Sequence, residues 1–514
     1  MERKWWTLIV VCVATFMLLL DITIVNVALP KIASSLHASF SDIQWVIDAY
    51  ALTLASVLLT MGALADLIGR RLVFTVGLAL FSLASLLCAL SPSALFLIIA
   101  RGAQGIGGSI MFATSLALLA QEFRGRDRGT AFGAWGATIA ASAAVGPLLG
   151  GFLTEDFGWA SIFYINVPIG FACVALAIAK VAESRNPGNA RIDWVGTVTF
   201  TAALFMIVFA IIRGNALGWT SGEILGLFAG GGALLIAFIV SQFVLPNAMF
   251  DVTLFRKPAF AGASIVGFTL SASMFAMFLY LVLYLQTILG FSPLQTGLRF
   301  LPFTVISFFV AVMSGRLTER VPVRLLLGTG MVMVSVGLLL MRGLTPSSHW
   351  TALLAGFLIS GAGVGLVNPP LAATAIGVVP PQRSGMASGI NNTFRQVGIA
   401  TGIAALGAIF ESTLRNKLAS ALVHTPVAGH AAALSHAVAA GGAQQVIASA
   451  PRQFRPEATA AIHSAFASAM NDVLLVGFIL AVVGAVLAYA LVRSSDFVSA
   501  GAPAEHPQEA AAVA

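Results

Sequence analysis

Charged residues are scarce in this sequence. Its 514 residues include 27 lysines and arginines and 20 aspartates and glutamates, or 9% of the chain, whereas soluble proteins carry about 25%. Hydrophobic residues make up 59%, and the mean hydropathy is +0.96. A soluble protein must present a polar surface to water. The composition therefore excludes an ordinary cytosolic enzyme, a disordered protein and a nucleic-acid-binding protein.

Cysteines and catalytic motifs are also few. The three cysteines, Cys12, Cys88 and Cys173, lie in apolar stretches and imply no disulfide framework. The sequence contains no H-E-x-x-H, G-x-S-x-G or C-x-x-C motif. A membrane enzyme would need a catalytic constellation near one surface, and all seven histidines stand outside recognisable motifs. We therefore expect no enzymatic activity, no metal and no cofactor.

Long apolar stretches are the dominant feature that is present. A membrane-spanning helix needs about 20 apolar residues. Fourteen stretches qualify, beginning near Trp6, Ile43, Leu72, Leu95, Gly129, Ile162, Trp194, Glu223, Ala259, Pro293, Val323, Thr351, Gly385 and Asp472. The first is too long for a cleaved signal and contains Asp21 and Asn26. The predicted fold is an all-α polytopic membrane protein with fourteen transmembrane helices.

The basic residues of the loops predict the orientation. With the N-terminus in the cytoplasm, 17 basic residues lie on the cytoplasmic side: Arg3, Lys4, Arg70, Arg71, Arg124, Arg126, Arg128, Lys180, Arg185, Arg191, Arg256, Lys257, Arg316, Arg320, Arg324, Arg383 and Arg493. The short outer loops hold three, namely Lys31, Arg213 and Arg342. This asymmetry predicts a multi-pass protein of the cytoplasmic (inner or plasma) membrane with both termini cytoplasmic.

Three short patterns recur at a nearly constant offset. The pattern G-x-L-x-acid has an offset of 253 residues, whereas G-x-A-x-G and a G-x-G pair have an offset of 256. The matching segments are 62–71 with 315–324, 129–133 with 385–389, and 105–107 with 361–363. Parallel repeats of six spans are a transporter architecture. The repeat therefore predicts two six-helix bundles separated by an inserted pair of spans.

The predicted domains follow from this repeat. Residues 1–187 form the first bundle, 188–250 the inserted pair of spans (the seventh and eighth), and 251–494 the second bundle. The second bundle includes a long extracytoplasmic loop at about 412–470, and 495–514 form a disordered cytoplasmic tail. The loop contains His424, His430, His436 and His463, whose spacing matches no compact metal-ligand motif, so we expect a solvated, partly helical loop.

Three ionisable residues share one depth in the first bundle. Asp21, Asp48 and Arg101 should lie about 9–13 Å below the outer surface, from a rise of 1.5 Å per residue. A buried charge costs at least about 2.5–3.5 kcal/mol, which makes each a functional candidate. Desolvation favours protonated carboxylates, so we hypothesise that Asp21 and Asp48 alternately bind protons and cationic substrate, tuned by Arg101. The alternative is a structural ion pair of either aspartate with Arg101.

Two further features lie within spans. Arg395 stands near mid-membrane among polar neighbours, and it either lines a cavity or makes a structural hydrogen bond between the bundles. In the fifth span, Gly146, Pro147, Gly150 and Gly151 place four helix-disrupting residues in a stretch of six. Such a face permits close helix approach, as in a hinge or seal, or forms an ordinary packing groove.

Six segments together resemble the major facilitator superfamily, specifically its fourteen-span drug/proton antiporters of the EmrB/QacA type. The resemblance covers about residues 5–495. The matching segments are 20–30 in the first span, 45–50 in the second, the loop 62–71, 101–107 in the fourth, 142–151 in the fifth and 163–170 in the sixth. The chain departs from the family pattern at Leu67, where a basic residue is usual, and at Ser142, where glycine is usual.

The resemblance implies a function as well as a fold. It implies export of lipophilic, often cationic drugs or toxic compounds by alternating access, driven by the proton-motive force without another cofactor. It implies proton-coupling roles for Asp21, Asp48 and Arg101. We add Arg395, Asn26 and Gln104 to the candidate proton-coupling or substrate residues. It implies a cytoplasmic gating motif of Gly62, Asp66, Gly69, Arg70 and Arg71, and an antiporter motif containing Gly146, Pro147, Gly150 and Gly151.

The expected partners are protons, lipophilic small molecules and membrane lipid, without nucleic acid, and we expect a monomer. Two alternative functions remain open. One is a dedicated exporter of a single metabolite, lipid or self-made antibiotic, and the other is a channel or passive uniporter. A flexible apolar cavity carries no sharp sequence code for its substrate.

Overall fold

The computed structural model describes residues 2–38, 40–185, 193–245, 250–318, 320–379, 384–421 and 454–493, with single residues at 438, 443, 446, 447 and 496. Within these ranges the regular secondary structure is entirely helical, with no strand. The first part of the chain forms α1 (Arg3–Leu36), α2 (Phe40–Ile68), α3 (Arg70–Ala89), α4 (Ala94–Glu122), α5 (Arg126–Asp156), α6 (Ser161–Tyr164) and α7 (Asn166–Lys180).

Two helices separate this part from the second bundle, α8 (Trp194–Leu217) and α9 (Gly222–Val244). The remaining helices are η1 (Val252–Arg256), α10 (Pro258–Leu270), η2 (Ser271–Phe275), α11 (Ala276–Leu283), η3 (Tyr284–Ile288), α12 (Pro293–Leu317), α13 (Val323–Leu340), η4 (Trp350–Leu353), α14 (Leu354–Gly377), α15 (Ser384–Ala421) and α18 (Arg455–Leu491). The segments η2 and η3 are π-helical turns that continue α10 and α11 as one span.

Each of the fourteen predicted spans corresponds to a helix. Among the described residues, thirteen are long and apolar enough to cross a membrane by length and composition. The remaining predicted span corresponds to α5, which has 31 residues and packs against α1 and α12. The prediction of a fourteen-helix polytopic membrane protein is confirmed.

The end of the chain differs from the sequence prediction. The last span begins at Arg455 rather than near Asp472, and α15 continues to Ala421, beyond the predicted loop start at Ser412. The Oγ1 of Thr413 donates to Oδ2 of Asp472 at 2.9 Å, joining the two extensions. Alanine-rich sequence has high helix propensity, so these helices extend past their apolar stretches. Hydropathy marks the length that spans a membrane and not the full length of a helix.

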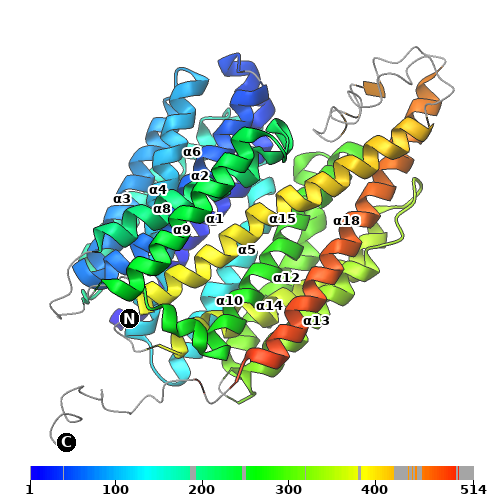
Figure 1. Cartoon of the computed structure of the whole chain (residues 1–514). Helices are drawn as coiled ribbons and strands as arrows, with labels where there is room; N and C mark the ends of the chain where they lie inside the picture. Colours follow the sequence, from blue (N-terminus) through cyan, green and yellow to red (C-terminus); the bar gives the residue numbers. More distant parts are fainter. Residues whose placement is uncertain are drawn as a thin grey trace, which may run out of the picture.

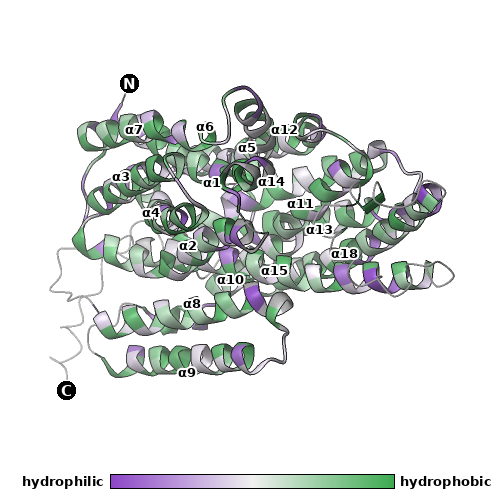
Figure 2. Cartoon of the chain, turned by 90° about the horizontal axis from the view of Figure 1, so that it is seen from above, coloured by the Kyte–Doolittle hydropathy of each residue, from purple (hydrophilic) through white to green (hydrophobic). Residues whose placement is uncertain are grey.

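The helices form two groups that lie close together where α1 begins and diverge at the opposite end (Figure 1). Helices α8 and α9 lie at one edge of the assembly, with α9 outermost (Figure 2). Helix α8 packs against α2 and α15, whereas α9 contacts α8. The Nε2 of Gln242 in α9 donates to Oδ2 of Asp193 at 2.8 Å, and the other carboxylate oxygen of Asp193 caps α8. Helix α8 therefore attaches the inserted pair to both groups of helices, and α9 also contacts η1 of the second group.

Glycine contacts repeat between the two halves. A Cβ on Gly107 in α4 would lie 2.6 Å from the backbone nitrogen of Phe81 in α3. A Cβ on Gly363 in α14 would lie 2.8 Å from the backbone nitrogen of Val334 in α13. Phe81 and Val334 are separated by 253 residues, which is also the offset of the loop pattern. The sequence repeat thus corresponds to equivalent helix packing within each half.

The contacts between the halves are equivalent too. A Cβ on Gly133 in α5 would approach the carbonyl oxygen of Ala311 in α12 to 3.1 Å. A Cβ on Gly389 in α15 would approach the carbonyl oxygen of Leu58 in α2 to 3.4 Å. Leu58 and Ala311 are again 253 residues apart. The halves therefore meet through two related interfaces, α5 with α12 and α15 with α2.

Candidate functional site

Asp21 is at the centre of a buried polar cluster. It lies on α1 and is 1% exposed. Its Oδ2 forms an ion pair with the guanidinium of Arg101 on α4. Its Oδ1 accepts from Nε2 of Gln104 at 2.9 Å and from Nδ2 of Asn166 at 3.3 Å. The carboxylate is thus fully enclosed and hydrogen-bonded on both oxygens.

Further contacts hold the cluster in place. The Nε of Arg101 donates to the carbonyl of Val46 at 3.0 Å, and the guanidinium carbon lies 4.2 Å from the centre of the Tyr50 ring. The Oγ of Ser85 accepts from Gln104 at 2.7 Å and from Asn166 at 3.2 Å. Helices α1, α2, α3, α4 and α7 all contribute. An arginine so held can leave Asp21 only if several contacts change together.

The structure thus joins three predicted residues, Asp21, Arg101 and Gln104. It adds two that the sequence reasoning missed. Asn166 stands in the sixth-span segment 163–170, which carried a signal for the family but none for a contact with Asp21. Ser85 carried no signal, because a serine inside an apolar helix usually bonds its own backbone. The side chain of Asn26, also predicted for this site, lies outside the described residues.

Asp48 does not join this cluster. Val46 and Tyr50 face Arg101, and Asp48 lies midway between them in α2. At 100° per residue, the midway position points to the opposite side of the helix. The half-buried carboxylate interacts electrostatically with Arg213 of α8 instead. The predicted shared site is therefore two sites on opposite faces of α2.

Arg213 is another residue that the sequence reasoning misplaced. It was expected in a short outer loop, but α8 continues to Leu217. Its guanidinium carbon lies 5.5 Å from the centre of the Trp45 ring, and that ring lies 5.6 Å from Phe209. A carboxylate beside aromatic rings is suited to bind a cation, and here an arginine of the inserted pair takes that position.

Two of the predicted gating residues, Asp66 and Arg70, lie at a contact between the halves. Asp66 accepts from Nε of Arg70 at 2.8 Å and from the backbone nitrogen of Met386 at 2.9 Å. Met386 lies in the first turn of α15, whose free N–H groups and dipole favour a carboxylate. Asp66 is 7% exposed and Arg70 6%. This contact fastens α2 to α15 at the end where α1 begins.

The rest of the gating motif shapes the turn from α2 to α3. Gly69 has φ +136°, in the region that favours glycine. Glu183 accepts from the backbone nitrogens of Arg71 and Leu72 at 3.0 Å each, and so caps α3. The Nη1 of Arg71 also donates to the carbonyl of Val181 at 3.4 Å, and Gly62 is buried within α2. The motif is thus anchored to the end of α7 as well as to α15.

The glycines of α5 allow it to approach α1 closely. A Cβ on Gly146 would lie 2.6 Å from Cβ of Thr23, and one on Gly150 would lie 2.9 Å from Cγ1 of Ile24. Gly151 is buried, and the side chain of Pro147 lies outside the described residues. Both Thr23 and Ile24 follow Asp21 on α1. The glycine-containing segment of α5 thus packs against α1 directly after the residue at the centre of the polar cluster.

Arg395 is separate from Asp21 and 5% exposed. Its guanidinium carbon lies 5.9 Å from the centre of the Phe275 ring. Among the described residues it has neither an ion pair nor a hydrogen bond. The predicted alternative of a hydrogen bond between the bundles therefore has no counterpart in the described part of the chain.

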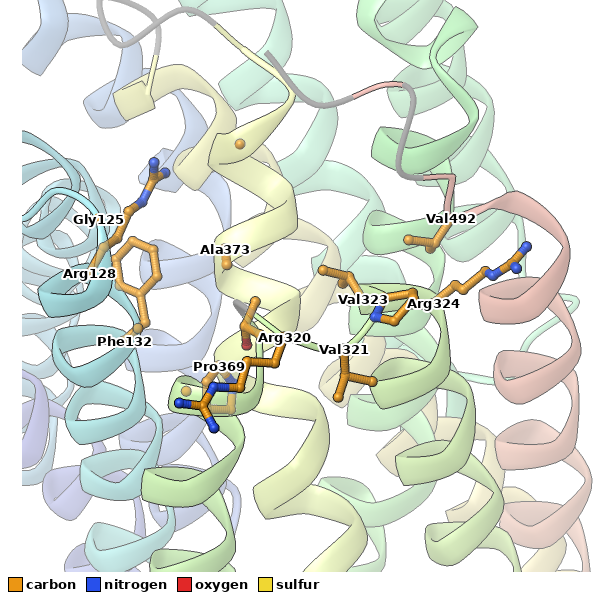
Figure 3. A pocket seen from close by; sticks show the side chains of 15 residues that line it. Gly125, Arg128, Phe132, Arg320, Val321, Val323, Arg324, Pro369, Ala373 and Val492 are labelled. Atoms are coloured by element: carbon orange, nitrogen blue, oxygen red, sulfur yellow. The ribbon is translucent and has the colours of Figure 1, made fainter. Parts of the chain in front are cut away.

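A cavity of about 490 Å³ lies between the halves (Figure 3). It lies at the end where α1 begins, since Nζ of Lys4 donates to Asp127, the residue before Arg128 in the cavity wall. Its wall includes Arg128 and Phe132 of α5, Arg320 after α12, and Pro369 and Ala373 of α14. Its size falls within the range of small-molecule sites.

No metal-ligand cluster of three or more His, Cys, Asp or Glu residues occurs in the described ranges. His463 lies within α18, whereas the other loop histidines, His424, His430 and His436, are not among the residues described. In the predicted tail 495–514 the structure describes Asp496, whose Oδ2 accepts from the backbone nitrogen of Ala259 at 2.9 Å and caps α10.

A family model of the Major Facilitator Superfamily matches residues 11–403. The chain belongs to this superfamily. The multidrug resistance protein Stp of Mycobacterium tuberculosis (strain CDC 1551 / Oshkosh) is 36% identical over 411 residues, covering 79% of this chain and 76% of Stp. The tetracenomycin C resistance and export protein of Streptomyces glaucescens is 30% identical and covers 95% of this chain and 91% of its own. The methylenomycin A resistance protein of Streptomyces coelicolor is 34% identical, and the match covers 77% of this chain and 83% of that protein.

Solved structures share the fold. The proton:xylose symporter XylE matches with a TM-score of 0.64 at 12% identity, covering 95% of this chain and 96% of its own. The human organic anion transporter MFSD10 (TETRAN) matches with a TM-score of 0.59 at 14% identity, and the match covers 94% of this chain and 100% of that transporter. The predicted family is confirmed. The chain is a multi-pass membrane transporter whose curated relatives are multidrug and antibiotic resistance or export proteins.

Proposed function

We propose that this transporter is a proton-coupled antiporter that exports lipophilic, often cationic drugs or toxic compounds across the cytoplasmic membrane. The observation that carries the proposal is the Asp21 cluster, in which a fully buried carboxylate is paired with an arginine. A proton bound by Asp21 removes the negative charge that holds Arg101, so proton binding changes the contacts among α1, α4 and α7. This provides a physical link between protonation and helix arrangement.

Alternating access uses the two bundles as moving bodies. We assign residues 1–187 and 251–494 to these bodies and 188–250 to the inserted pair, with both termini cytoplasmic and the protein acting as a monomer. The contact of Asp66 with Met386 closes the cytoplasmic side and must break when the protein opens inward. The close packing of α5 on α1 near Thr23 transmits a shift of the Asp21 cluster to α12, the neighbour of α5 across the interface.

The test is dye efflux in vesicles under an imposed pH gradient, comparing wild type with Asp21→Asn. The exposed Asp156→Asn serves as the matched control, since it removes a carboxylate without touching the cluster. We expect Asp21→Asn to lose gradient-driven efflux while retaining exchange of dye across the membrane without a gradient. Retained exchange distinguishes lost coupling from misfolding. Efflux by wild type that ignores the pH gradient, or normal coupling in Asp21→Asn, would contradict the proposal.

A second candidate is a dedicated exporter of one antibiotic or metabolite. It is favoured by relatives named for resistance to single compounds, methylenomycin A and tetracenomycin C. Resistance profiles across chemically unrelated dyes, quaternary ammonium compounds and antibiotics separate the two candidates. Protection against one class alone would favour the dedicated exporter, and protection against several would favour the multidrug exporter.

A further inference from the structure

Several buried polar groups between the two halves have no hydrogen-bond partner. Asn368 on α14 is 0% exposed, and neither its Nδ2 nor its Oδ1 is bonded. The same holds for Nδ2 of Asn391, Oδ1 of Asn392 on α15, and Nε1 of Trp135 on α5. An unsatisfied buried polar group costs about 1–3 kcal/mol, so a set of them calls for an explanation.

The groups on α14 and α15 are neighbours around Gly267 of α10. A Cβ on Gly267 would lie 3.2 Å from Cγ of Arg395, 3.5 Å from Nδ2 of Asn391 and 3.6 Å from Cδ2 of Leu371. Leu371 is one turn after Asn368 on α14. Arg395 and Asn391 are likewise one turn apart on α15. The unpaired arginine and the unpaired amides therefore belong to one region.

The first half completes this region with aromatic rings. A Cβ on Gly136 would lie 3.4 Å from Cβ of Asn368, and Trp135 is its neighbour in α5. The Trp135 ring stacks with Phe112 at 6.0 Å between centroids and 24° between planes. The Nδ2 of Asn392 donates to the carbonyl of Phe112 at 3.2 Å. We call Trp135, Asn368, Asn391 and Arg395 the Arg395 cluster.

The internal repeat indicates that the amides are not required for packing. Phe112 and Asn368 are 256 residues apart, as are Trp135 and Asn391. This is the offset of the G-x-A-x-G pattern. At equivalent positions the first half therefore has two aromatic residues and the second half has two asparagines. One half offers rings for stacking and the other offers hydrogen-bonding groups.

Most of the free groups in this region are donors. The guanidinium has five N–H groups, the indole of Trp135 donates only, and Asn368 and Asn391 each have an unbonded amide nitrogen. An unpaired positive charge inside a membrane protein is expensive. A ligand that accepts hydrogen bonds and carries negative charge would relieve both costs. Trp135 and Phe112 would receive its aromatic part.

The cavity between the halves is lined by residues on the same helices as the cluster, α5 and α14. Pro369 in its wall directly follows Asn368, and Phe132 lies one turn before Trp135 (Figure 3). The cavity lies at the cytoplasmic end in the proposed orientation. This is the side that the contact of Asp66 with Met386 closes, so a compound from the cytoplasm would pass Phe132 and Pro369 only after that side opens.

We propose that the Arg395 cluster binds acidic aromatic compounds, meaning flat ring systems that carry a carboxylate, a phenolate or carbonyl groups. Arg395 pairs with the acidic group, Asn368 and Asn391 donate to further oxygens, and Trp135 stacks on the ring. This inference rests on the proposed export function and adds to it a second substrate class. We assign cationic compounds to a different site, the carboxylate of Asp48 on α2.

The test compares two xanthene dyes with similar rings and opposite charge, the anion carboxyfluorescein and the cation rhodamine 6G. Equilibrium binding to the purified full-length transporter in nanodiscs is measured by fluorescence anisotropy without a pH gradient. The variants are Arg395→Gln, Arg395→Lys and Asn368→Leu. The control is Arg342→Gln, which removes the same charge from an exposed position outside the cluster.

We expect Arg395→Gln to weaken carboxyfluorescein binding about tenfold or more, the order found for charged hydrogen bonds, and to change rhodamine 6G binding less than twofold. Arg395→Lys should recover part of the loss, and Arg342→Gln should match wild type. If Arg395→Gln fails to fold, Asn368→Leu should still weaken the anionic dye selectively, by severalfold.

Three results would overturn the inference. Wild type could fail to bind the anion, the variants could bind both dyes as well as wild type, or both dyes could weaken equally without rescue by lysine. The last result would assign Arg395 a structural role. Because binding is measured without a gradient, failure of proton coupling leaves this test unaffected, so failure of the inference can be distinguished from failure of proton coupling.

Discussion

At the scale of single residues, the ion pair of Asp21 with Arg101 is the most constrained element of the site. Both residues are 1% exposed and each has further hydrogen bonds. Removing one partner of such a pair leaves an uncompensated buried charge, which costs about 3–5 kcal/mol. Removing both charges avoids that cost. The pair is therefore suited to a double-mutant cycle.

We expect Arg101→Gln alone to lower the free energy of unfolding by about 3–5 kcal/mol, and Asp21→Asn with Arg101→Gln to be markedly less destabilised than the sum of the single variants. Thermal or denaturant unfolding of the purified protein measures this. Additive effects would mean that the two charges do not interact.

Sequence reasoning identified Asp21, Arg101 and Gln104 because a charge inside an apolar stretch is conspicuous and because family motifs mark the same residues. It did not separate Asp48 from them, since equal depth says nothing about which face of a helix a residue occupies. The carbonyl of Val46 and the ring of Tyr50 settle the direction, because both contact Arg101. The face of α2 that Asp48 occupies is known only from the residues that pack against the helix.

At the scale of helices, α8 contributes a charge to the Asp48 site. Arg213 is half-buried, so its attraction to Asp48 is worth about 1 kcal/mol at most after solvent screening. If cationic substrates bind at Asp48, Arg213 competes with them. The inserted pair then tunes cation affinity and is more than a peripheral addition.

We expect Arg213→Gln to lower the KM for a cationic dye about threefold to fivefold, corresponding to about 1 kcal/mol. Asp48→Asn should abolish this gain in the double variant. Arg342→Gln controls for the general loss of a positive charge. An unchanged KM in Arg213→Gln would remove α8 from the site.

The contact of α5 with α1 sets a second expectation at this scale. Gly146→Ala places a Cβ against Thr23, so we expect reduced thermal stability, by about 1–3 kcal/mol, and slower efflux. The matched control is Gly232→Ala in α9, where a Cβ meets no atom within 4 Å and alanine favours the helix. Size-exclusion chromatography and thermal unfolding of both variants measure the difference. Equal stability of the two variants would contradict the close packing.

The helices themselves were largely predictable, whereas some of their ends and irregularities were not. Apolar length located thirteen starts close to those observed. It failed for α18, whose first residues are alanine-rich and lie outside the apolar stretch. The π-helical turns at Ser271–Phe275 and Tyr284–Ile288 had no signal either. Hydropathy reports how apolar a stretch is and does not distinguish a π-helical turn from an α-helical one.

At the scale of the whole molecule, the proposed role of the contact of Asp66 with Met386 is to stabilise a form closed at the cytoplasmic end. We expect Asp66→Asn to shift the equilibrium toward an open form, by about 1 kcal/mol or severalfold in population. A cysteine introduced at Leu59, which is 2% exposed where α2 meets Gly389, should then react faster with a thiol reagent. Asp156→Asn is the control, and equal labelling rates would show that Asp66 does not hold this closure.

The two interfaces between the halves also bear on how a cell stores energy. A membrane that holds a proton gradient stores electrochemical energy, and any open pore through it dissipates that energy. Gly133 on Ala311 and Gly389 on Leu58 bring the helices together in the same way at two places. If the gradient powers this transporter as proposed, close packing at both places limits proton leakage between the halves, so that transport does not dissipate the gradient that drives it.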